Sequence, residues 1–365
     1  MDLRQDVSEL IRALRLVMVI GLVFVHFGNF PGEALDPFSG VINPNYFLAS
    51  SLNSFFTYFF LCSVPILSLI SGYLFSYKNE ITYLDTLKKK YKTLVKPYLT
   101  WTLLWVLFAF VLFKIGQSSG RFTYFDLGFD NYSLLTFMNN VVGLTEAPFA
   151  FQFWFVHDLI LSILITPFLF WTFKRLGWIM VLIPFTLWLL EFEALVFFNY
   201  KVISFFALGL YVGHKDIALS LPKRFALLNL SILAFIILVL TRIYLPASND
   251  GVMPFEVQFE LLLRVIGSIA IITLTLHLRQ WLPSFYRFLV KQSGKAFYLH
   301  AFHFPVVILV KQVLFSLGLF SGNLGHIALW LASVLITVLL AFLTAQATHI
   351  TVPSLYRHLN GQRTI

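Results

Sequence analysis

The chain is poor in cysteine and in charge. Cys62 is its single cysteine, so no intramolecular disulfide can form and a disulfide-stapled secreted fold is excluded. Only 12% of the 365 residues are Asp, Glu, Lys or Arg, about half the share that soluble domains carry. No long polar stretch indicates an appended soluble domain, and no internal repeat is visible. We therefore expect one domain over residues 1–365, of a class other than the soluble globular proteins.

The chain is instead rich in long hydrophobic runs. It is 59% hydrophobic and 18% aromatic, with a mean hydropathy of +0.82. Several apolar runs reach about 20 residues, the length at which an α-helix crosses a bilayer. The sequence predicts an all-α, polytopic transmembrane bundle of about ten helices, over residues 12–30, 51–77, 98–116, 150–172, 177–197, 202–213, 226–245, 257–278, 296–316 and 326–347.

Lysine and arginine gather in alternate loops, and most acidic residues fall in the loops between them. Residues 88–96 form the most basic loop, whereas Asp126 belongs to the acidic set. The positive-inside rule then predicts that both termini are cytoplasmic. The net charge of +9 reflects this topology and does not require a nucleic-acid partner. The first apolar segment lacks a small-residue cleavage site, so we expect a retained span rather than a signal peptide.

The first span contains two ionisable residues, Arg15 and His26. Eleven residues of helix correspond to about 16 Å and about three turns, so both side chains lie on one face. Arg15 is expected near the start of the span and His26 about half a bilayer deeper. Ionisable groups inside membrane helices are costly and usually functional. A buried imidazole is a good general base, and a guanidinium fits phosphate oxygens. A helix-packing histidine and a topology-setting arginine are the structural alternatives.

A cluster of lysines precedes the third span. The cluster comprises Lys88, Lys89, Lys90, Lys92 and Lys96. Such a cluster usually sets topology or binds anionic lipid, but it also suits a polyphosphate-bearing cofactor that approaches from the cytosol. The loop has no glycine-rich phosphate motif, so lysine side chains would make the contact.

The second span ends in a polar and flexible stretch. Pro65 is expected to kink the helix. Ser71 and Gly72 leave room for a ligand or a neighbouring backbone, and Tyr73 supplies a hydroxyl. Small residues in membrane helices more often serve packing.

The fourth span opens with Gln152, Trp154, His157 and Asp158 near its outer end. Trp154 is also explained by the interfacial aromatic belt. His157 and Asp158 are adjacent and point about 100° apart on a helix. We therefore expect that they do not form a dyad.

Further ionisable residues lie in the later spans. His300 and His303 are about one helical turn apart, but no carboxylate or cysteine set accompanies them, and no metal is expected. A polar lining near the cytoplasmic mouth is the preferred interpretation. Lys311 is expected to reach toward the membrane surface. Arg242 and Arg264 also fall within predicted spans, and Arg264 is expected to face a cavity.

These segments resemble, in order, the elements of the acyltransferase-3 family, bacterial integral membrane O-acyltransferases that modify surface polysaccharides. The family has an arginine, ten residues and a histidine in its first helix, which is the spacing of Arg15 and His26. The resemblance continues through ILSLISGYLFS, FWFVHDLILSILITPF, ISFFALGLYVG and SGKAFYLHAFHFP, and it covers about residues 15–310.

One element departs from the family pattern. The family usually has two arginines, three residues apart, before its third helix, whereas this chain has Lys89 and Lys92 at that spacing. The positive charge is retained, but the bidentate geometry of arginine is lost. Many family members also carry a fused extracytoplasmic hydrolase-like domain. None is visible here, so acyl delivery is expected within the membrane domain.

The resemblance implies transfer of an acyl group from cytosolic acyl-CoA, with acetyl-CoA as the expected donor. The acceptor would be a hydroxyl of a surface polysaccharide or lipid-linked glycan, and the location the bacterial inner membrane. Three roles follow as expectations: catalysis by His26, Tyr73 and His300; acyl-CoA binding by Arg15, Lys89, Lys92, Ser71 and Gly72; and acceptor binding by Trp154, Asp158 and Arg264. His26 would act as a base or form a transient acyl-histidine. A carrier or flippase for a glycan intermediate is the alternative, with Arg242 and Arg264 in its path.

Overall fold

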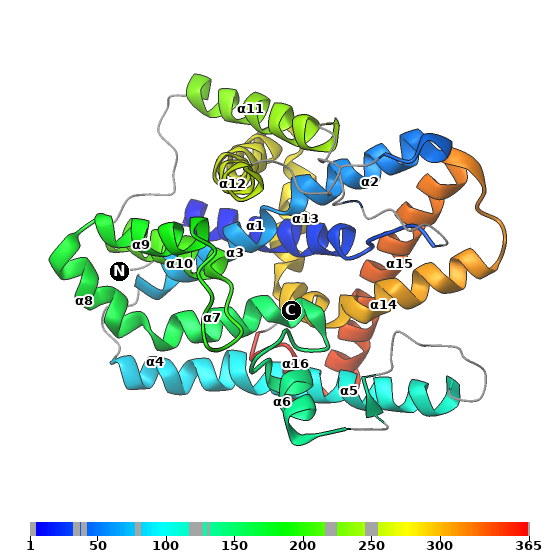
Figure 1. The fold of residues 1–365 in the computed structure, drawn as a ribbon, viewed down its shortest axis with the longest axis horizontal. Helices are drawn as coiled ribbons and strands as arrows, with labels where there is room; N and C mark the ends of the chain where they lie inside the picture. Colours follow the sequence, from blue (N-terminus) through cyan, green and yellow to red (C-terminus); the bar gives the residue numbers. More distant parts are fainter. Residues whose placement is uncertain are drawn as a thin grey trace. The chain divides into compact units, whose positions relative to one another are not determined.

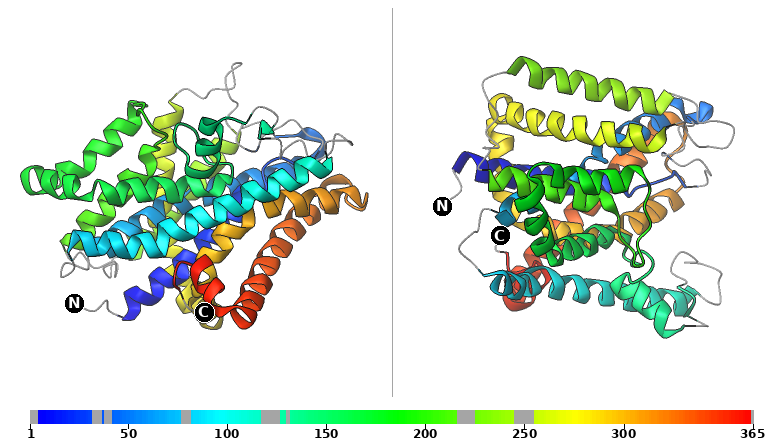
Figure 2. Two further views of the ribbon diagram at one scale, coloured as in Figure 1. Left: turned by 90° about the horizontal axis from the view of Figure 1, so that it is seen from below. Right: turned by 60° about the vertical axis from the view of Figure 1, so that its left-hand side comes forward.

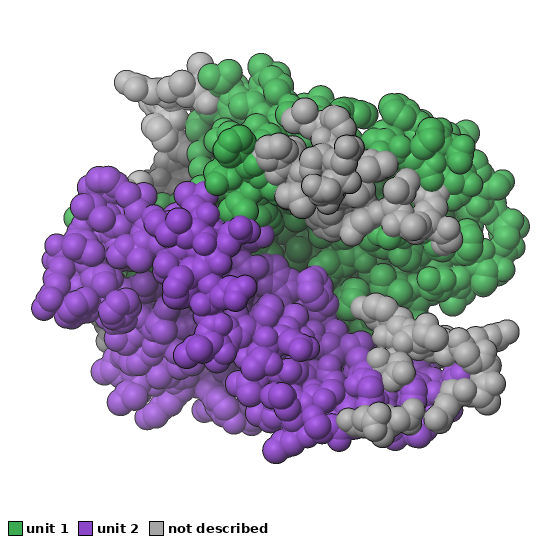
Figure 3. All heavy atoms as spheres, viewed as in Figure 1, with its two compact units in different colours: residues 1–78, 205–346, 365 green, residues 79–204, 347–364 purple. Residues whose placement is uncertain are grey.

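The computed structural model describes residues 5–31, 37, 42–76, 82–116, 127–129, 132–215, 225–244 and 255–363 (Figure 1). These residues form helices and turns, with no β-strand among them. Contacts divide the chain into two compact units: unit 1 comprises residues 1–78, 205–346 and 365, and unit 2 comprises residues 79–204 and 347–364 (Figure 3). The predicted all-α class is confirmed.

Unit 1 is assembled from the beginning and the later part of the chain. Its helices are α1 (Gln5–Val25), α2 (Phe47–Phe60), α3 (Ser63–Ser76), most of α10 (Tyr200–His214), α11 (Phe225–Tyr244), α12 (Glu256–Trp281), α13 (Pro283–Gln292), α14 (Ala296–Ser316) and most of α15 (Gly322–Thr351). Helix α1 contacts α2, α3, α12, α13 and α14, and its buried residues point in several directions. It is therefore the central helix of the unit. Helices α11 and α12 lie side by side (Figure 2).

Unit 2 contains α4 (Tyr83–Lys90), α5 (Lys96–Gly116), α6 (Leu134–Val142), α7 (Trp154–Leu164), α8 (Thr166–Leu176), α9 (Ile179–Leu189) and α16 (Pro353–Leu359). Helix α16 is fixed to α5 by polar contacts. The indole Nε1 of Trp101 donates to the carbonyl of Leu359 at 3.0 Å, and the Thr100 hydroxyl lies 2.8 Å from His358 Nε2.

Six helical segments of the described chain are long and apolar enough to cross a membrane. They cover residues 5–27, 44–76, 83–116, 256–281, 283–316 and 322–351. Helices α7 and α8 form a further candidate that is bent by 58°, while residues 179–189 and 228–244 form shorter apolar helices. The chain is thus a multi-pass membrane protein, and ten spans remain a prediction.

The expected start of the first helix was wrong. Helix α1 begins at Gln5 rather than at residue 12, because polar contacts support the additional turns. Gln5 Nε2 donates to Glu9 Oε1 at 3.1 Å, and Arg12 Nε donates to Ser293 Oγ at 3.4 Å. Arg15 therefore lies near the middle of α1 and His26 just beyond its end.

The predicted kink in the second span is confirmed as a break between α2 and α3 at Leu61–Cys62. Proline has no N–H, so Pro65 cannot donate to the carbonyl four residues earlier, that of Leu61. Arg264 on α12 donates from Nη1 to this oxygen instead, at 3.1 Å. The break therefore couples α2 to α12.

Glycines allow α3 and α10 to approach closely. A side chain at Gly72 would collide with the backbone oxygen of Phe206, and one at Gly209 with that of Leu69. Small residues at a helix–helix contact let membrane helices pack backbone against backbone. The SGYL segment that contains Gly72 therefore holds α10 in place.

Candidate active site

His26 is placed at the carboxyl end of α1. Its backbone N–H still donates to the carbonyl of Leu22 at 2.9 Å, and Gly28, with a φ of 64°, then turns the chain out of the helix. The His26 side chain meets His303, which is fully buried on α14. The two nitrogens His26 Nδ1 and His303 Nε2 lie 2.9 Å apart, and the rings stack with centroids 5.0 Å apart.

The contacts of His303 determine the tautomer of both rings. His303 Nδ1 lies 2.8 Å from the carbonyl oxygen of His300 and 3.1 Å from that of Leu299. Carbonyl oxygens only accept, so Nδ1 carries the hydrogen, and in the neutral ring Nε2 is an acceptor. His26 must then donate from Nδ1. The lone pair of His26 is consequently on Nε2, the nitrogen that can accept a proton or attack a carbonyl carbon.

A break in α14 brings His303 to this position. Phe304 has a non-helical backbone (φ −115°, ψ 128°) and precedes Pro305 inside the helix. The ring of Phe304 meets the His26 ring edge-on, with centroids 5.5 Å apart. His300 is buried nearby, with its ring centroid 5.7 Å from that of His303. The structure thus brings His300 close to the predicted catalytic histidine.

Among the described residues, no group of three or more His, Cys, Asp or Glu side chains is arranged to hold a metal ion. The His300–His303 pair is instead part of the polar environment of His26.

Arg15 is half-buried in the middle of α1. Within the described parts of the chain it has no hydrogen bond and no ion pair. Its neighbour Arg12 is exposed and contacts α13 through Ser293. A guanidinium inside a helical bundle without a counter-charge is energetically unfavourable. Arg15 is therefore suited to an anionic ligand.

Ser71, Gly72 and Tyr73 have packing partners. The Ser71 hydroxyl donates to the carbonyl of Leu67 at 2.7 Å, Gly72 lies against α10, and Tyr73 is buried. The close packing against α10 explains the glycine at position 72 without a ligand. A ligand-binding role for Ser71, Gly72 and Tyr73 stays a prediction.

The predicted donor-binding lysines belong to unit 2. Lys89 lies in the last turn of α4, and Lys92 lies in a π-helical turn, Tyr91–Val95, that joins α4 to α5. Both side chains are exposed, whereas Lys88 lies 3.9 Å from Asp85. Lys89 and Lys92 thus present charge to the surface of this unit.

The expectation that His157 and Asp158 do not pair was wrong. His157 Nδ1 lies 2.9 Å from Asp158 Oδ1, although the Cα–Cβ bonds of neighbouring helical residues diverge. The imidazole and carboxylate are long enough to turn back toward each other at the start of α7. Asp158 Oδ2 also accepts from the backbone N–H of Asn199 at 3.0 Å. Trp154 is half-buried at the first position of α7.

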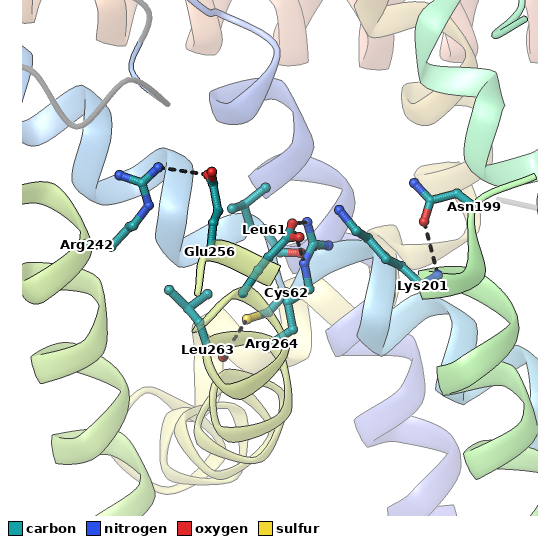
Figure 4. A network of polar contacts seen from close by, with 9 residues as sticks. Leu61, Cys62, Asn199, Lys201, Arg242, Glu256, Leu263 and Arg264 are labelled. Carbon is teal, nitrogen blue, oxygen red and sulfur yellow. Dashed lines mark hydrogen bonds and ion pairs between the residues drawn. The ribbon is translucent and has the colours of Figure 1, made fainter. Parts of the chain in front are cut away.

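Arg242 and Arg264 border a pocket of about 140 Å³ in unit 1, and Figure 4 shows both side chains with their polar partners. Arg242 donates to Glu256 at 3.1 Å and lies over the ring of Tyr58. Arg264 donates to Glu260 through both Nε and Nη2. The pocket is lined by Tyr58, Leu61, Arg242, Glu256, Phe259, Glu260, Leu263 and Arg264.

Sequence reasoning missed both the His26–His303 bond and the glutamate partners of the arginines. Glu260 and Arg264 are four residues apart, the spacing of a helical ion pair, so this partner was detectable. The histidine pair joins positions 277 residues apart, and no local pattern indicates it. Lys311, which was expected to reach the membrane surface, is instead buried against the end of α1.

Comparison with known proteins identifies the class. Residues 9–346 match the acyltransferase-3 family, described as an acyltransferase domain. The chain is also 26% identical over 324 residues to the succinoglycan biosynthesis protein ExoH of Rhizobium meliloti (strain 1021), a match that covers 86% of this chain and 82% of that protein. No solved structure matches. The chain belongs to the acyltransferase-3 family, and it is a membrane acyltransferase.

Proposed function

We propose that this enzyme transfers an acyl group from acyl-CoA, with acetyl-CoA as the expected donor, to a hydroxyl of a surface polysaccharide or lipid-linked glycan. The family assignment supports the reaction type, and the similarity to a succinoglycan biosynthesis protein supports a carbohydrate acceptor. The observation that carries the mechanism is the His26–His303 hydrogen bond, because it leaves the His26 lone pair on Nε2.

In the direct scheme, His26 Nε2 removes the proton of the acceptor hydroxyl while the oxygen attacks the thioester carbonyl carbon. The C–O bond forms, the C–S bond breaks, and coenzyme A leaves as the thiolate. In the covalent scheme, Nε2 first attacks the thioester carbonyl carbon, the C–S bond breaks, and coenzyme A leaves as the thiolate, so that Nε2 carries the acyl group. The acceptor oxygen then attacks the acyl carbon, the C–N bond breaks, and the hydroxyl proton passes to the released Nε2. Both schemes use the same nitrogen. His300 and Tyr73 are the proposed donors to the oxyanion.

The donor site is proposed to use Arg15 as its principal phosphate ligand. Its lack of a counter-ion among the described residues supports this role, since the planar fork of arginine matches phosphate oxygens. Lys89 and Lys92 would add electrostatic attraction from their exposed positions, and Ser71 and Gly72 are the remaining proposed coenzyme contacts.

The proposed acceptor contacts are Arg264 in unit 1, and Trp154 and Asp158 in unit 2. The pocket beside Arg264 combines two guanidinium groups, two carboxylates and the rings of Tyr58 and Phe259. Charged groups that bond two hydroxyls at once, beside an aromatic face, suit a sugar ring. Asp158 is committed to His157 and Asn199, so its effect on the acceptor would be indirect.

We further propose a single catalytic domain over residues 1–365 in the bacterial inner membrane, with ten spans and both termini in the cytoplasm. The alternative is a carrier or flippase for a glycan intermediate, and acyl transfer is preferred because residues 9–346 match an acyltransferase domain.

The deciding experiment supplies purified protein with labelled acetyl-CoA and candidate glycans, and measures coenzyme A release and label on the glycan. We expect rapid transfer by the wild type and only a small residual rate by His26→Gln, which keeps hydrogen bonding and most of the bulk. Loss of a general base typically lowers a rate by about 10²–10⁴. Equal donor binding by both proteins excludes misfolding as the cause, and wild-type turnover in His26→Gln would reject the mechanism.

A further inference from the structure

The chain immediately after His26 is held by a lysine from α14. Lys311 Nζ donates to the carbonyl oxygen of Phe27 at 2.6 Å and to that of Asn29 at 2.8 Å. The lysine is buried, and its ammonium also lies over the Phe27 ring, 4.7 Å from the centroid. One side chain thus binds two carbonyl groups on either side of the turn that ends α1.

The carbonyl between these two is held by a second helix. Asn53 Nδ2, on α2, donates to the carbonyl oxygen of Gly28 at 2.9 Å, and Asn53 is also buried. Gly28 has a positive φ of 64°, the conformation that commonly ends a helix. Three consecutive carbonyl groups therefore have donors from distant parts of the chain.

The location explains why such donors are needed. Residues 27–29 follow the end of α1 at Val25, so their carbonyl groups have no partner in a continuing helix, and a buried backbone carbonyl is costly unless a donor reaches it. The lysine charge is also favourable at the negative end of the helix dipole. Residues 27–29 consequently have one well-defined path, which begins at the residue after His26.

We propose that Lys311 and Asn53 are positioning residues for His26. By fixing residues 27–29 they fix the backbone at position 26, and with it the direction in which Nε2 faces the reacting carbon. This inference rests on the proposed function of His26. It adds two residues to the reaction that sequence patterns and family resemblance did not assign.

The alternative is that the two residues only complete the helix end and have no effect on the reaction. The test compares Lys311→Met, which keeps the length of the side chain but removes the donor, with Asn53→Leu. Lys295→Met is the matched control, because Lys295 is also buried, at the start of α14, with its ammonium over the Phe342 ring and no carbonyl partner among the described residues.

Purified, monodisperse protein is assayed for kcat, for the donor KM and for acetyl-CoA affinity. We expect kcat to fall about 10- to 100-fold in both Lys311→Met and Asn53→Leu, because a misplacement of about 1 Å can cost about 10²-fold in rate. The donor KM and affinity should stay near wild type. Lys295→Met should keep the wild-type kcat.

A double-mutant cycle separates positioning from general structural support. If Lys311 acts through His26, then Lys311→Met should not lower the residual activity of His26→Gln any further. Additive losses would show that the lysine supports the fold independently of His26, and would overturn the proposal. If Lys311→Met is not monodisperse, the same cycle is run with Asn53→Leu combined with His26→Gln. If neither Lys311→Met nor Asn53→Leu yields monodisperse protein, the two residues support the fold and the positioning proposal is overturned.

The outcomes distinguish this proposal from the proposed function. An inactive His26→Gln beside fully active Lys311→Met and Asn53→Leu would remove the positioning role and leave the mechanism intact. A fully active His26→Gln would remove the mechanism itself.

Discussion

His303 Nε2 accepts a hydrogen bond from His26 Nδ1 at 2.9 Å, and this contact fixes the His26 tautomer that has its lone pair on Nε2. His303 is itself fixed by the carbonyl groups of Leu299 and His300. Orientation therefore passes from the backbone of α14 to His303 and then to His26. An oriented imidazole of this kind is the usual basis of general-base and nucleophilic catalysis by histidine.

Replacing His303 should therefore damage catalysis more than binding. His303→Phe keeps an aromatic ring against His26 but removes the acceptor, so the His26 tautomer is no longer fixed. We expect kcat to fall about 10- to 100-fold, as for partners that orient a functional histidine. Labelled-donor turnover measures kcat, and calorimetry with acetyl-CoA should give wild-type affinity. An unchanged kcat would show that the histidine pair is structural.

Arg15→Ala should weaken acyl-CoA binding. Loss of a charged hydrogen bond costs about 1.5–3 kcal/mol, and Arg15→Lys should recover only part of it because the bidentate fork is missing. Calorimetry measures the affinity, with Arg12→Ala as the exposed control on the same helix. Wild-type acyl-CoA affinity in Arg15→Ala would show that Arg15 does not bind the phosphates of the coenzyme.

The double variant Lys89→Ala/Lys92→Ala should also weaken acyl-CoA binding, because it removes the long-range attraction of two positive charges. Both side chains are exposed, so the effect should grow as the salt concentration falls. Calorimetry at two ionic strengths checks this. A loss of affinity that does not change with salt would contradict the electrostatic role.

The α3–α10 contact should be intolerant of a single methyl group. Gly72→Ala and Gly209→Ala each place a Cβ against the backbone of the facing helix, and overpacking of this kind costs about 1–3 kcal/mol. We expect lower thermal unfolding temperatures for both in detergent. Ser71→Ala, which adds no volume, is the control. If Ser71→Ala instead weakens acetyl-CoA binding, its proposed role at the donor site gains support.

Arg242→Gln and Glu256→Gln should raise the KM for the glycan and leave the donor KM unchanged. Both residues border the pocket beside Arg264, and each variant leaves the other partner without its counter-charge. Initial rates at varied glycan and fixed saturating acetyl-CoA measure the effect. Wild-type glycan KM in both variants would place the acceptor outside this pocket.

The sequence predicted the helical class and placed Arg15 and His26 in one apolar segment, because hydrophobic periodicity and spacing are local properties. It did not predict that α1 ends at Val25, one residue before His26. It also predicted the effect of Pro65, since a missing N–H disturbs any helix. The structure adds the partner of the released carbonyl, Arg264 Nη1. That partner lies on a helix about 200 residues later, and a single sequence gives no signal for such a contact.

The polar residues were the least predictable part of the site. The direction of Cα–Cβ bonds separates His157 from Asp158, yet their flexible side chains meet within one helix. Lys311 has the length to reach a membrane surface, but it binds the carbonyl groups of Phe27 and Asn29, just after α1, in the interior. In both cases the pairing of buried polar groups prevailed over the local geometric rule.

The partners of α1 also constrain how the enzyme is made. The bonds of His303 to His26 and of Lys311 to Phe27 join residues that are 277 and 284 positions apart. During synthesis α1 leaves the ribosome long before α14, with Arg15 in its middle. The first helix must therefore wait in the membrane, without its histidine partner or its terminal lysine, until more than four-fifths of the chain has been translated. A truncated chain that ends before α14 would insert helices but would lack an oriented His26.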